Sequence, residues 1–131
     1  EMFDSYRIFY GQASDNEAAQ SFLTQRMADE DSVIFVAYRD SEAAGFAQLY
    51  PSYSSVSLAR TWVLNDLFVK EDCRGCGVGR ALLDRSVQHA SETKSAFISL
   101  VTGVDNVIAQ KLYESAHWIR DEEYYRYVFK T

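Results

Sequence analysis

The chain has 131 residues, of which 47% are apolar and 15% aromatic, and its formal net charge is −6. This length and composition exclude disorder and predict one folded domain over residues 1–131. The acidic balance and the lack of a dense basic cluster disfavour nucleic acid and anionic membranes as partners. With no bilayer-length apolar run and no signal-peptide pattern at the start, we expect a soluble, cytoplasmic protein.

Two helices are predicted first, over residues 1–11 and 14–28. Ser14 and Glu17 have the spacing of a capping box, which predicts the start of the second helix. Runs rich in β-branched and aromatic residues, bounded by turn residues, then predict three strands over residues 33–38, 46–50 and 60–69.

The third strand is expected at the centre of a sheet, because it is apolar on both faces. One predicted face carries Trp62, Leu64 and Phe68, and the other carries Val63, Leu67 and Val69. Alternating helix and strand patterns follow over residues 78–90, 95–102, 105–116 and 122–130. This order of elements predicts a mixed α/β layer fold.

Between the third strand and the next helix lies the segment CRGCGVGRALL, residues 73–83, with glycine at Gly75, Gly77 and Gly79. A glycine-rich turn before a helix points backbone amides at an anion, and the positive end of the helix dipole adds to this attraction. The spacing fits neither the dinucleotide fingerprint nor the phosphate loop of nucleotide triphosphatases. A turn without a ligand is the alternative reading.

The same segment contains Cys73 and Cys76 in a C-x-x-C frame, which raises the possibility of a redox or metal site. The cysteines do not have the placement at a helix start that a thioredoxin-like pair needs. His89 and His117 are far away in sequence and there is no second cysteine pair, so we expect no metal. A redox protein is kept as a third hypothesis.

Two motifs at their correct separation resemble the GNAT superfamily of acetyl-CoA-dependent N-acetyltransferases. The first is Arg74-Gly75-Cys76-Gly77-Val78-Gly79, and the second is Asn106 followed by Leu112-Tyr113. The resemblance runs from about residue 33 to the end and looks closest to the polyamine and thialysine branch. It implies helices on both faces of a sheet that splays between the strands ending at Val69 and Val101. The family's first strand, which precedes the first helix, is missing from this sequence.

The resemblance implies that the loop amides hold the pyrophosphate of acetyl-CoA and that the third strand's backbone pairs with its pantetheine arm. The residues implied in cosubstrate binding are Leu67, Phe68, Val69, Arg74, Gly75, Cys76, Gly77, Val78, Gly79, Arg80, Asn106 and Tyr113. A non-catalytic acyl-CoA-binding module would use the same residues and is the main alternative.

The implied reaction is direct attack by a primary amine on acetyl-CoA in a ternary complex. Tyr113 matches the family's general acid, which returns a proton to the departing sulfur. The base is left open between Asp66 and a water held by Asn65, where polyamine-type relatives have Glu-Asp. The residues matching the acceptor site are Tyr10, Tyr50 and Tyr53. Two explanations of the missing first strand are open: this sequence is a fragment, or a neighbouring copy covers the exposed sheet edge, which would make the protein a homodimer.

Overall fold

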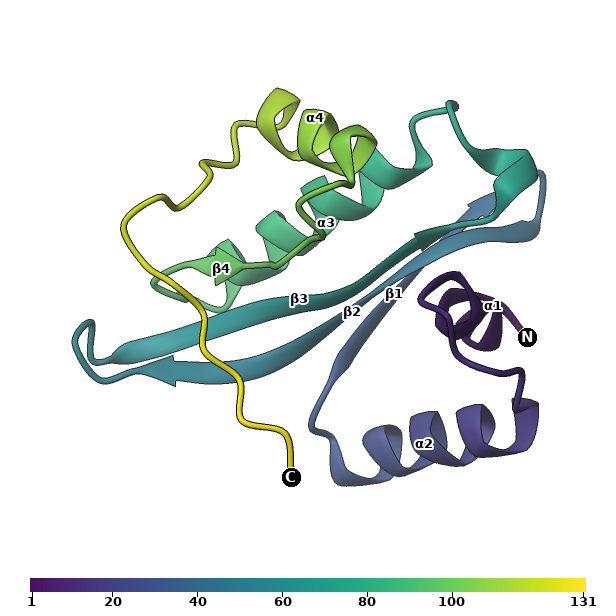
Figure 1. Ribbon diagram of the computed structural model, residues 1–131, viewed down its shortest axis with the longest axis horizontal. Coiled ribbons are helices and arrows are strands. Elements are labelled where there is room, and N and C mark those ends of the chain that lie inside the picture. The colour runs from purple at the N-terminus through teal and green to yellow at the C-terminus, as the bar shows by residue number, and fades with distance from the viewer. The chain divides into compact units, whose positions relative to one another are not determined.

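The structure is a computed structural model that describes residues 1–131 (Figure 1). The chain divides into two compact units, Glu1–Val101 and Thr102–Thr131. The expectation of one domain over residues 1–131 remains a prediction. None of the helices combines the length and the hydrophobicity needed to cross a lipid bilayer.

The first unit contains most of the expected elements. The strand expected over residues 95–102 is reduced to two residues. In chain order the elements are α1 (Met2–Phe9), α2 (Asn16–Asp29), β1 (Val33–Arg39), β2 (Glu42–Ser54), β3 (Ala59–Val69), the 3-10 helix η1 (Glu71–Cys73), α3 (Val78–Glu92) and β4 (Ile98–Ser99).

The four strands form one mixed sheet in the order β1-β2-β3-β4, which places β3 inside the sheet as predicted. β1, β2 and β3 pair antiparallel, whereas β4 runs parallel to β3. The β3–β4 pairing joins only Trp62 to Ile98 and Val63 to Ser99. β4 ends at Ser99, so beyond Val63 this side of β3 has no paired strand. The predicted splay of the two strands remains a prediction.

Helices cover both faces of this sheet, as expected. α3 lies on one face, and α1 and α2 lie on the other (Figure 1). Successive residues of β2 show the alternation, because Gly45 faces Val78 and Leu82 of α3. The ring of the next residue, Phe46, instead packs edge-on against Phe3 of α1, with 6.0 Å between centroids. Odd-numbered and even-numbered residues in this part of β2 therefore pack against different helix layers.

A β-bulge in β3 changes which face its later residues occupy. Gln48 pairs with Asp66, but the next residue of β2 pairs with Leu64, so Asn65 is the extra residue. An unpaired residue shifts the alternation by one position. Trp62 therefore contacts α3 while Phe68 packs against α1, and the prediction that they share a face with Leu64 is wrong.

α1 and α2 are joined through the Asp4 carboxylate, which is buried at 3% exposure. The Ser14 hydroxyl donates to it at 2.6 Å and the Asp15 amide at 2.9 Å. These hydrogen bonds, the Ser14 bond first, hold the pKa of Asp4 below its usual value. The predicted capping box is wrong, because Asp15 caps α2 by accepting from the Ala18 amide, and Ser14 is used on Asp4.

Gly45 allows the start of α3 to pack closely on the sheet. A Cβ there would lie 2.6 Å from the Phe68 carbonyl oxygen and 3.2 Å from Val78 Cγ1. We therefore expect Gly45→Ala to lower the free energy of unfolding by about 1–3 kcal/mol, because the clash is with backbone. Urea denaturation measures it, with Gly103→Ala as control.

The control is matched because a Cβ on Gly103 would meet nothing within 4 Å. Its free energy of unfolding should stay within about 0.5 kcal/mol of the parent. Equal losses in both variants would contradict the packing role given to Gly45.

His89 of α3 lies in an aromatic cluster on the sheet. Its ring centroid is 4.8 Å from Trp62 and 5.5 Å from Phe35, both edge-on. Trp62 Nε1 in turn donates to the Thr93 hydroxyl at 2.9 Å. Burial, and then the nearby Arg85, lower the pKa of His89 from 6.5. The ring is a half-buried member of this cluster, and its surroundings favour the neutral form.

Because the folded state favours neutral His89, its contribution to stability is full above pH 6.5, the ordinary pKa. Stability should fall as the pH decreases from there through the lower folded-state pKa, since the unfolded chain is protonated first. Melting temperatures between pH 5 and 8 measure this. His89→Phe should remove the decline and His117→Asn should retain it. A decline of equal size in His89→Phe would assign it to another group.

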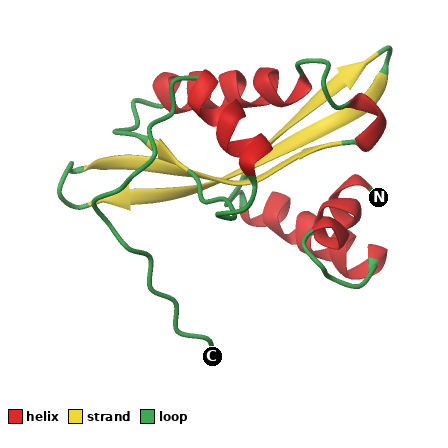
Figure 2. Ribbon diagram, turned by 45° about the horizontal axis from the view of Figure 1, so that its top comes forward, coloured by secondary structure: helices red, strands yellow, loops and turns green.

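The second unit contains one helix, α4 (Val107–Ser115), and an extended carboxyl-terminal segment. The strand expected over residues 122–130 is wrong, because these residues form no helix or strand (Figure 2). A strand needs a neighbouring strand to satisfy its backbone groups, and this unit contains none. Tyr125, Tyr127 and Phe129, which create the alternating pattern, are each 90% exposed.

Candidate active site

The glycine-rich loop joins the end of β3 to α3 through two residues in the left-handed region. Gly75 has φ 76° and Gly77 has φ 83°, and a Cβ on either would meet nothing within 4 Å. Glycine is thus needed for backbone conformation and not for space. Gly77 is also the N-cap of α3 and offers no side-chain acceptor to the first amides of the helix. Those amides point outward at the positive end of a 15-residue helix.

The two arginines beside the loop have partners within the protein. Arg74 Nε donates to the Val69 carbonyl at 3.0 Å, and its guanidinium lies 5.8 Å from the ring centroids of Phe9 and Phe68. Arg80 Nε donates to Asp84 at 3.0 Å. In this arrangement the backbone amides are the first groups available to an anion. Phosphate contacts by either arginine remain a prediction.

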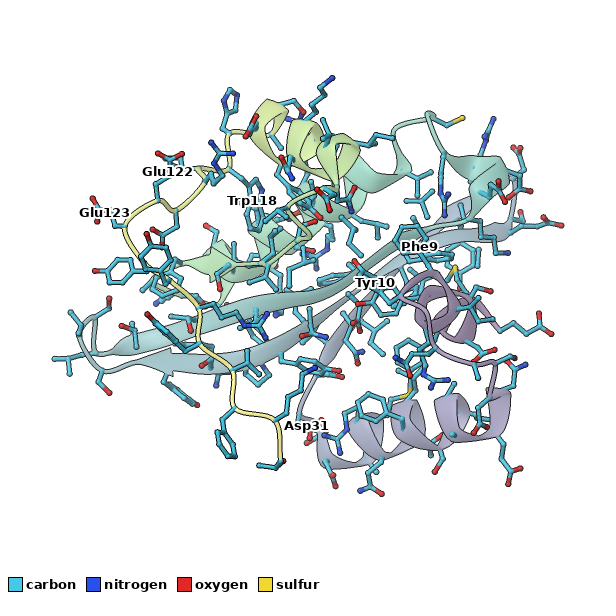
Figure 3. The ribbon with its side chains drawn as sticks, in the orientation of Figure 1. Phe9, Tyr10, Asp31, Trp118, Glu122 and Glu123 are labelled. Atoms are coloured by element: carbon cyan, nitrogen blue, oxygen red, sulfur yellow. The ribbon has the colours of Figure 1, made fainter.

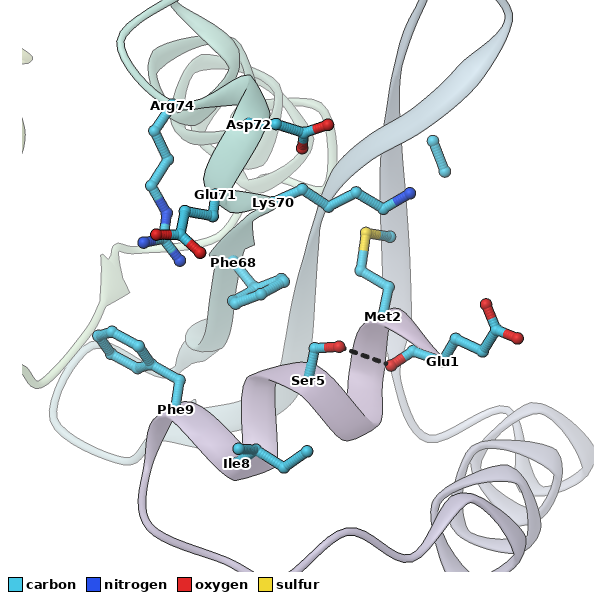
Figure 4. A pocket seen from close by; sticks show the side chains of 11 residues that line it. Glu1, Met2, Ser5, Ile8, Phe9, Phe68, Lys70, Glu71, Asp72 and Arg74 are labelled. Carbon is cyan, nitrogen blue, oxygen red and sulfur yellow. Dashed lines mark hydrogen bonds between the residues drawn. The ribbon is translucent and has the colours of Figure 1, made fainter.

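A cavity of about 710 Å³ opens between α1 and the end of β3 (Figure 4). Its lining includes Phe68 and Arg74, two of the residues expected to bind the cosubstrate. α1 supplies its other apolar wall, and the rim carries charges of both signs. The remaining lining residues are Glu1, Met2, Ser5, Ile8, Phe9, Ala43, Lys70, Glu71 and Asp72.

The bulge in β3 leaves one predicted site residue exposed and buries the other. Asn65 is exposed, whereas the Asp66 side chain is turned under α1 and its residue is only 2% exposed. Asn65 Nδ2 donates to Asp66 Oδ1 at 2.9 Å, and Gln48 Nε2 donates to Asp66 Oδ2 at 2.5 Å. From α1, the Tyr6 hydroxyl donates its one proton to the Asn65 carbonyl at 3.2 Å and lies close to the Asp66 carboxylate.

The tyrosines around Asp66 stay protonated. Burial and then the negative charge of Asp66 raise the pKa of Tyr6 far above its usual value, and the same two causes raise that of Tyr50 to about 12. The ring of Tyr10 packs edge-on against Tyr6, with 5.0 Å between centroids. Figure 3 shows Tyr10 beside Phe9 at the carboxyl end of α1. A carboxylate with an aromatic surround suits a cationic amine.

Of the three tyrosines expected to meet the acceptor, Tyr10 and Tyr50 lie around this cluster and Tyr53 does not. Tyr53 is 72% exposed near the tip of the β2–β3 hairpin. Its hydroxyl accepts from Arg60 Nη2 at 3.1 Å, and the Arg60 guanidinium lies over its ring. Its role in acceptor binding remains a prediction.

Two further predicted residues belong to the second unit. Asn106 is the N-cap of α4, and its side chain accepts from the Ala109 amide at 3.3 Å. Tyr113 lies on the same helix, half-buried, with its ring 6.3 Å from that of Trp118. The contact of Asn106 is thus that of a helix cap. The roles assigned to both residues in cosubstrate binding and catalysis remain predictions.

Cys73 and Cys76 are both free thiols. Burial, and then the nearby Asp72, raise the pKa of Cys73, which disfavours the thiolate that redox chemistry needs. Arg39 Nη1 donates to Cys76 Sγ at 3.0 Å. No three potential metal-ligating acidic, cysteine or histidine side chains come together in the chain. The geometry therefore favours anion binding by the backbone amides of this segment over redox chemistry at its two cysteines.

Tyr6 and Gln48 are not among the residues predicted from the sequence, although Gln48 bonds to Asp66 and Tyr6 bonds to the neighbouring Asn65. Tyr6 is 59 residues from Asn65, whose carbonyl it bonds. Gln48 is a polar residue inside a strand that is otherwise buried from Ala44 to Leu49. Gln48 could have been noticed as the one polar residue within an apolar stretch of its strand. No pattern in the sequence around Tyr6 indicates a functional role.

Comparison with known proteins agrees with this geometry. The sequence pattern of the acetyltransferase (GNAT) family matches residues 1–118. A protein of Bacillus subtilis, the uncharacterised N-acetyltransferase YhfO, is 40% identical over 126 residues, which are 96% of this chain and 85% of that protein. A probable acetyltransferase of Haemophilus influenzae is 38% identical over 95 residues, which are 72% of this chain and 65% of that protein.

A crystal structure of a probable acetyltransferase superimposes with a TM-score of 0.92 at 43% identity, covering 98% of this chain and 87% of the other. A mixed four-stranded sheet with helices on both faces is the fold of this family. The chain belongs to the GNAT family of acetyltransferases, and it is an N-acetyltransferase of this type.

Proposed function

We propose that the protein transfers the acetyl group of acetyl-CoA to a primary amine of a small molecule, such as a polyamine or a lysine-like compound. The observation that carries the proposal is the loop of Gly75 and Gly77. Both residues adopt the left-handed conformation immediately before a helix whose first amides have no side-chain cap. This arrangement suits a diphosphate, because amides and the helix dipole attract the same anion.

The pantetheine arm is proposed to pair with the backbone of β3 between Leu67 and Val69. The structure supports this because the β3–β4 pairing ends at Val63 and leaves the later part of β3 unpaired on that side. Amide groups of an extended ligand can pair with such an edge as a strand would.

The amine acceptor is proposed to meet the cluster around Asp66. A lysine-like amine has a pKa of about 10.4, so it must lose a proton before it can attack. Asp66 takes this proton, directly or through a water held by Asn65. The nitrogen then forms a bond to the acetyl carbon as the carbon–sulfur bond breaks, and Tyr113 gives a proton to the sulfur. The second proton that the nitrogen loses on becoming an amide passes, directly or through water, to the resulting tyrosinate and restores Tyr113.

The test is an acetyl-transfer assay read by mass spectrometry, across polyamines, lysine analogues, aminoglycosides and peptide amino termini. We expect an acceptor mass increase of one acetyl group for at least one small amine. Acetyl-CoA at millimolar concentration should also raise the melting temperature. A folded sample with neither effect would refute the proposal.

Replacing Tyr113 by phenylalanine should lower kcat by about 10²-fold or more, because the departing thiolate loses its proton donor. KM for acetyl-CoA should change little, since the ring is retained. Steady-state kinetics measure both values, with Tyr127→Phe as the control for loss of an exposed tyrosine hydroxyl. An unchanged kcat in Tyr113→Phe would remove this residue from the mechanism.

A non-catalytic acyl-CoA-binding module is the second candidate, since the loop geometry alone serves binding. It predicts thermal stabilisation by acetyl-CoA without transfer to any amine. The assay above therefore separates the two functions.

We also propose that the enzyme acts in the cytoplasm as a homodimer. Two free cysteines fit a reducing compartment. β1 is an edge strand with exposed apolar side chains, Val36 at 40% and Tyr38 at 69%, and a second copy would cover it. Light scattering should give twice the 15.0 kDa mass of the chain, and a monomer mass would refute the dimer.

A further inference from the structure

Gln48 is a completely buried polar residue in the middle of β2, at 0% exposure. Its side chain faces α1, like that of Asp66, its partner in the β2–β3 register. Its Nε2 donates to Asp66 Oδ2 at 2.5 Å. The Gln48 side chain makes this one hydrogen bond. Any role of the Gln48 amide is therefore exerted through Asp66.

The orientation of this amide has a cost. Gln48 Oε1 is buried and has no hydrogen-bond partner. A buried carbonyl oxygen without a partner destabilises the folded state, and an apolar side chain of similar volume would avoid this loss. Stability alone therefore gives no reason for glutamine here, whereas a donor aimed at the carboxylate does.

The Asp66 carboxylate is buried without a cationic partner. None of the ion pairs of the chain includes it. Its hydrogen bonds come from two neutral side chains, Gln48 of β2 and Asn65 of β3, and the Tyr6 hydroxyl of α1 lies beside it. Fixed neutral donors can hold a buried carboxylate and also define the direction in which its remaining lone pairs point.

We propose that Gln48 is a positioning residue, which holds the Asp66 carboxylate in the orientation from which it accepts the proton of the acceptor amine. This inference rests on the proposed function. Gln48 acts through Oδ2, while Asn65 binds Oδ1 at the edge of the bulge that faces solvent. The amine proton would reach Asp66 from the Asn65 side, since β2 and α1 close the others.

The other groups that face Asp66 do not replace Gln48. Tyr6 of α1 and Tyr50 of β2 remain protonated because their pKa values are raised. The charges of Arg26 and Asp31 also act on Tyr50, with opposite effects on its pKa. Tyr6 and Tyr50 are therefore neutral over the working pH range and do not change charge when Gln48 is replaced. Loss of the Gln48 donor should act on the Asp66 carboxylate directly.

The experiment compares Gln48→Met and Gln48→Glu with the parent enzyme. Methionine keeps the length but removes the donor, and glutamate places a second carboxyl group beside the first. Gln88→Met is the matched control, because Gln88 is an exposed residue of α3 bonded to Glu92. The first measurement is the pH dependence of kcat/KM for acetyl transfer. The second is a ¹³C-carboxyl NMR titration of the free protein, with the signal of position 66 identified by its loss in Asp66→Asn.

We expect the acid limb of kcat/KM to move to higher pH by about one unit in Gln48→Met and further in Gln48→Glu. The midpoint of the carboxyl titration should move in the same order, and the control should match the parent. Melting temperatures should show that Gln48→Met is folded and not strongly destabilised.

Two results would overturn the inference. One is a folded Gln48→Met enzyme whose acid limb and carboxyl titration match the parent, and the other is a loss of stability without either shift. A parent protein that transfers acetyl to no amine would refute the proposed function instead. In that case the carboxyl titration alone decides whether Gln48 controls Asp66.

Discussion

Replacing Gly77 by valine is expected to raise the dissociation constant for acetyl-CoA by about tenfold or more. Gly77 has φ 83°, a conformation that costs a β-branched residue about 1–3 kcal/mol. The loop would relax to a negative φ and turn away the amides of the first turn of α3. Isothermal titration with acetyl-CoA measures the change, and thermal stabilisation by the ligand should decrease in parallel.

Gly11→Val is the matched control for this variant. Gly11 has φ 81° and open space around it, as Gly77 has, but it follows α1 and lies outside the loop. Both substitutions should lower stability to a similar extent, and only Gly77→Val should weaken acetyl-CoA binding. Equal affinities in Gly77→Val and the parent would mean that the diphosphate is not held by these amides.

The features that could be predicted from sequence are those with local causes. The glycine loop is one, because glycine readily adopts the positive φ that Gly75 and Gly77 have. The central position of β3 is another, since a strand that is apolar on both faces must be covered on both. Together with the distant Leu112-Tyr113 pair they were enough to indicate the family.

The features that could not be predicted depend on contacts between distant segments. The register of β2 against β3 places the bulge at Asn65, and nothing within β3 alone specifies it. That single extra residue moved Phe68 to the face of α1 and turned Asp66 under the helix. Ser14 is a second example. It donates to the buried Asp4 of another helix, and it does not cap α2 as the spacing predicted.

The tail illustrates a different limit. Alternation of Tyr125, Tyr127 and Phe129 is typical of a strand, but a strand exists only where another strand supplies its hydrogen bonds. The alternating pattern tells which side chains would lie on the same face of a strand. It does not tell whether a neighbouring strand is present to pair with. In the second unit that partner is absent, and the segment is extended without pairing.

Replacing Asp66 by asparagine is expected to lower kcat/KM by about 10²–10⁴-fold near neutral pH, because the amide cannot accept the proton of the amine. The loss should shrink as the pH rises toward the pKa of the acceptor, about 10.4 for a lysine-like amine, since the free amine then needs no base. The pH dependence of kcat/KM measures both effects. Asp29→Asn, at the exposed end of α2, is the control for loss of one acidic charge.

The two candidate bases predict different results for this pair of neighbours. If Asp66 takes the proton, Asp66→Asn is severely impaired while Asn65→Ala is affected less, because the carboxylate keeps its bond to Gln48. If a water on Asn65 takes it, Asn65→Ala is the more impaired enzyme and Asp66→Asn retains most of its activity. We expect the first order, because the bulge gives Asp66 two side-chain donors and leaves Asn65 facing solvent, where water exchanges freely.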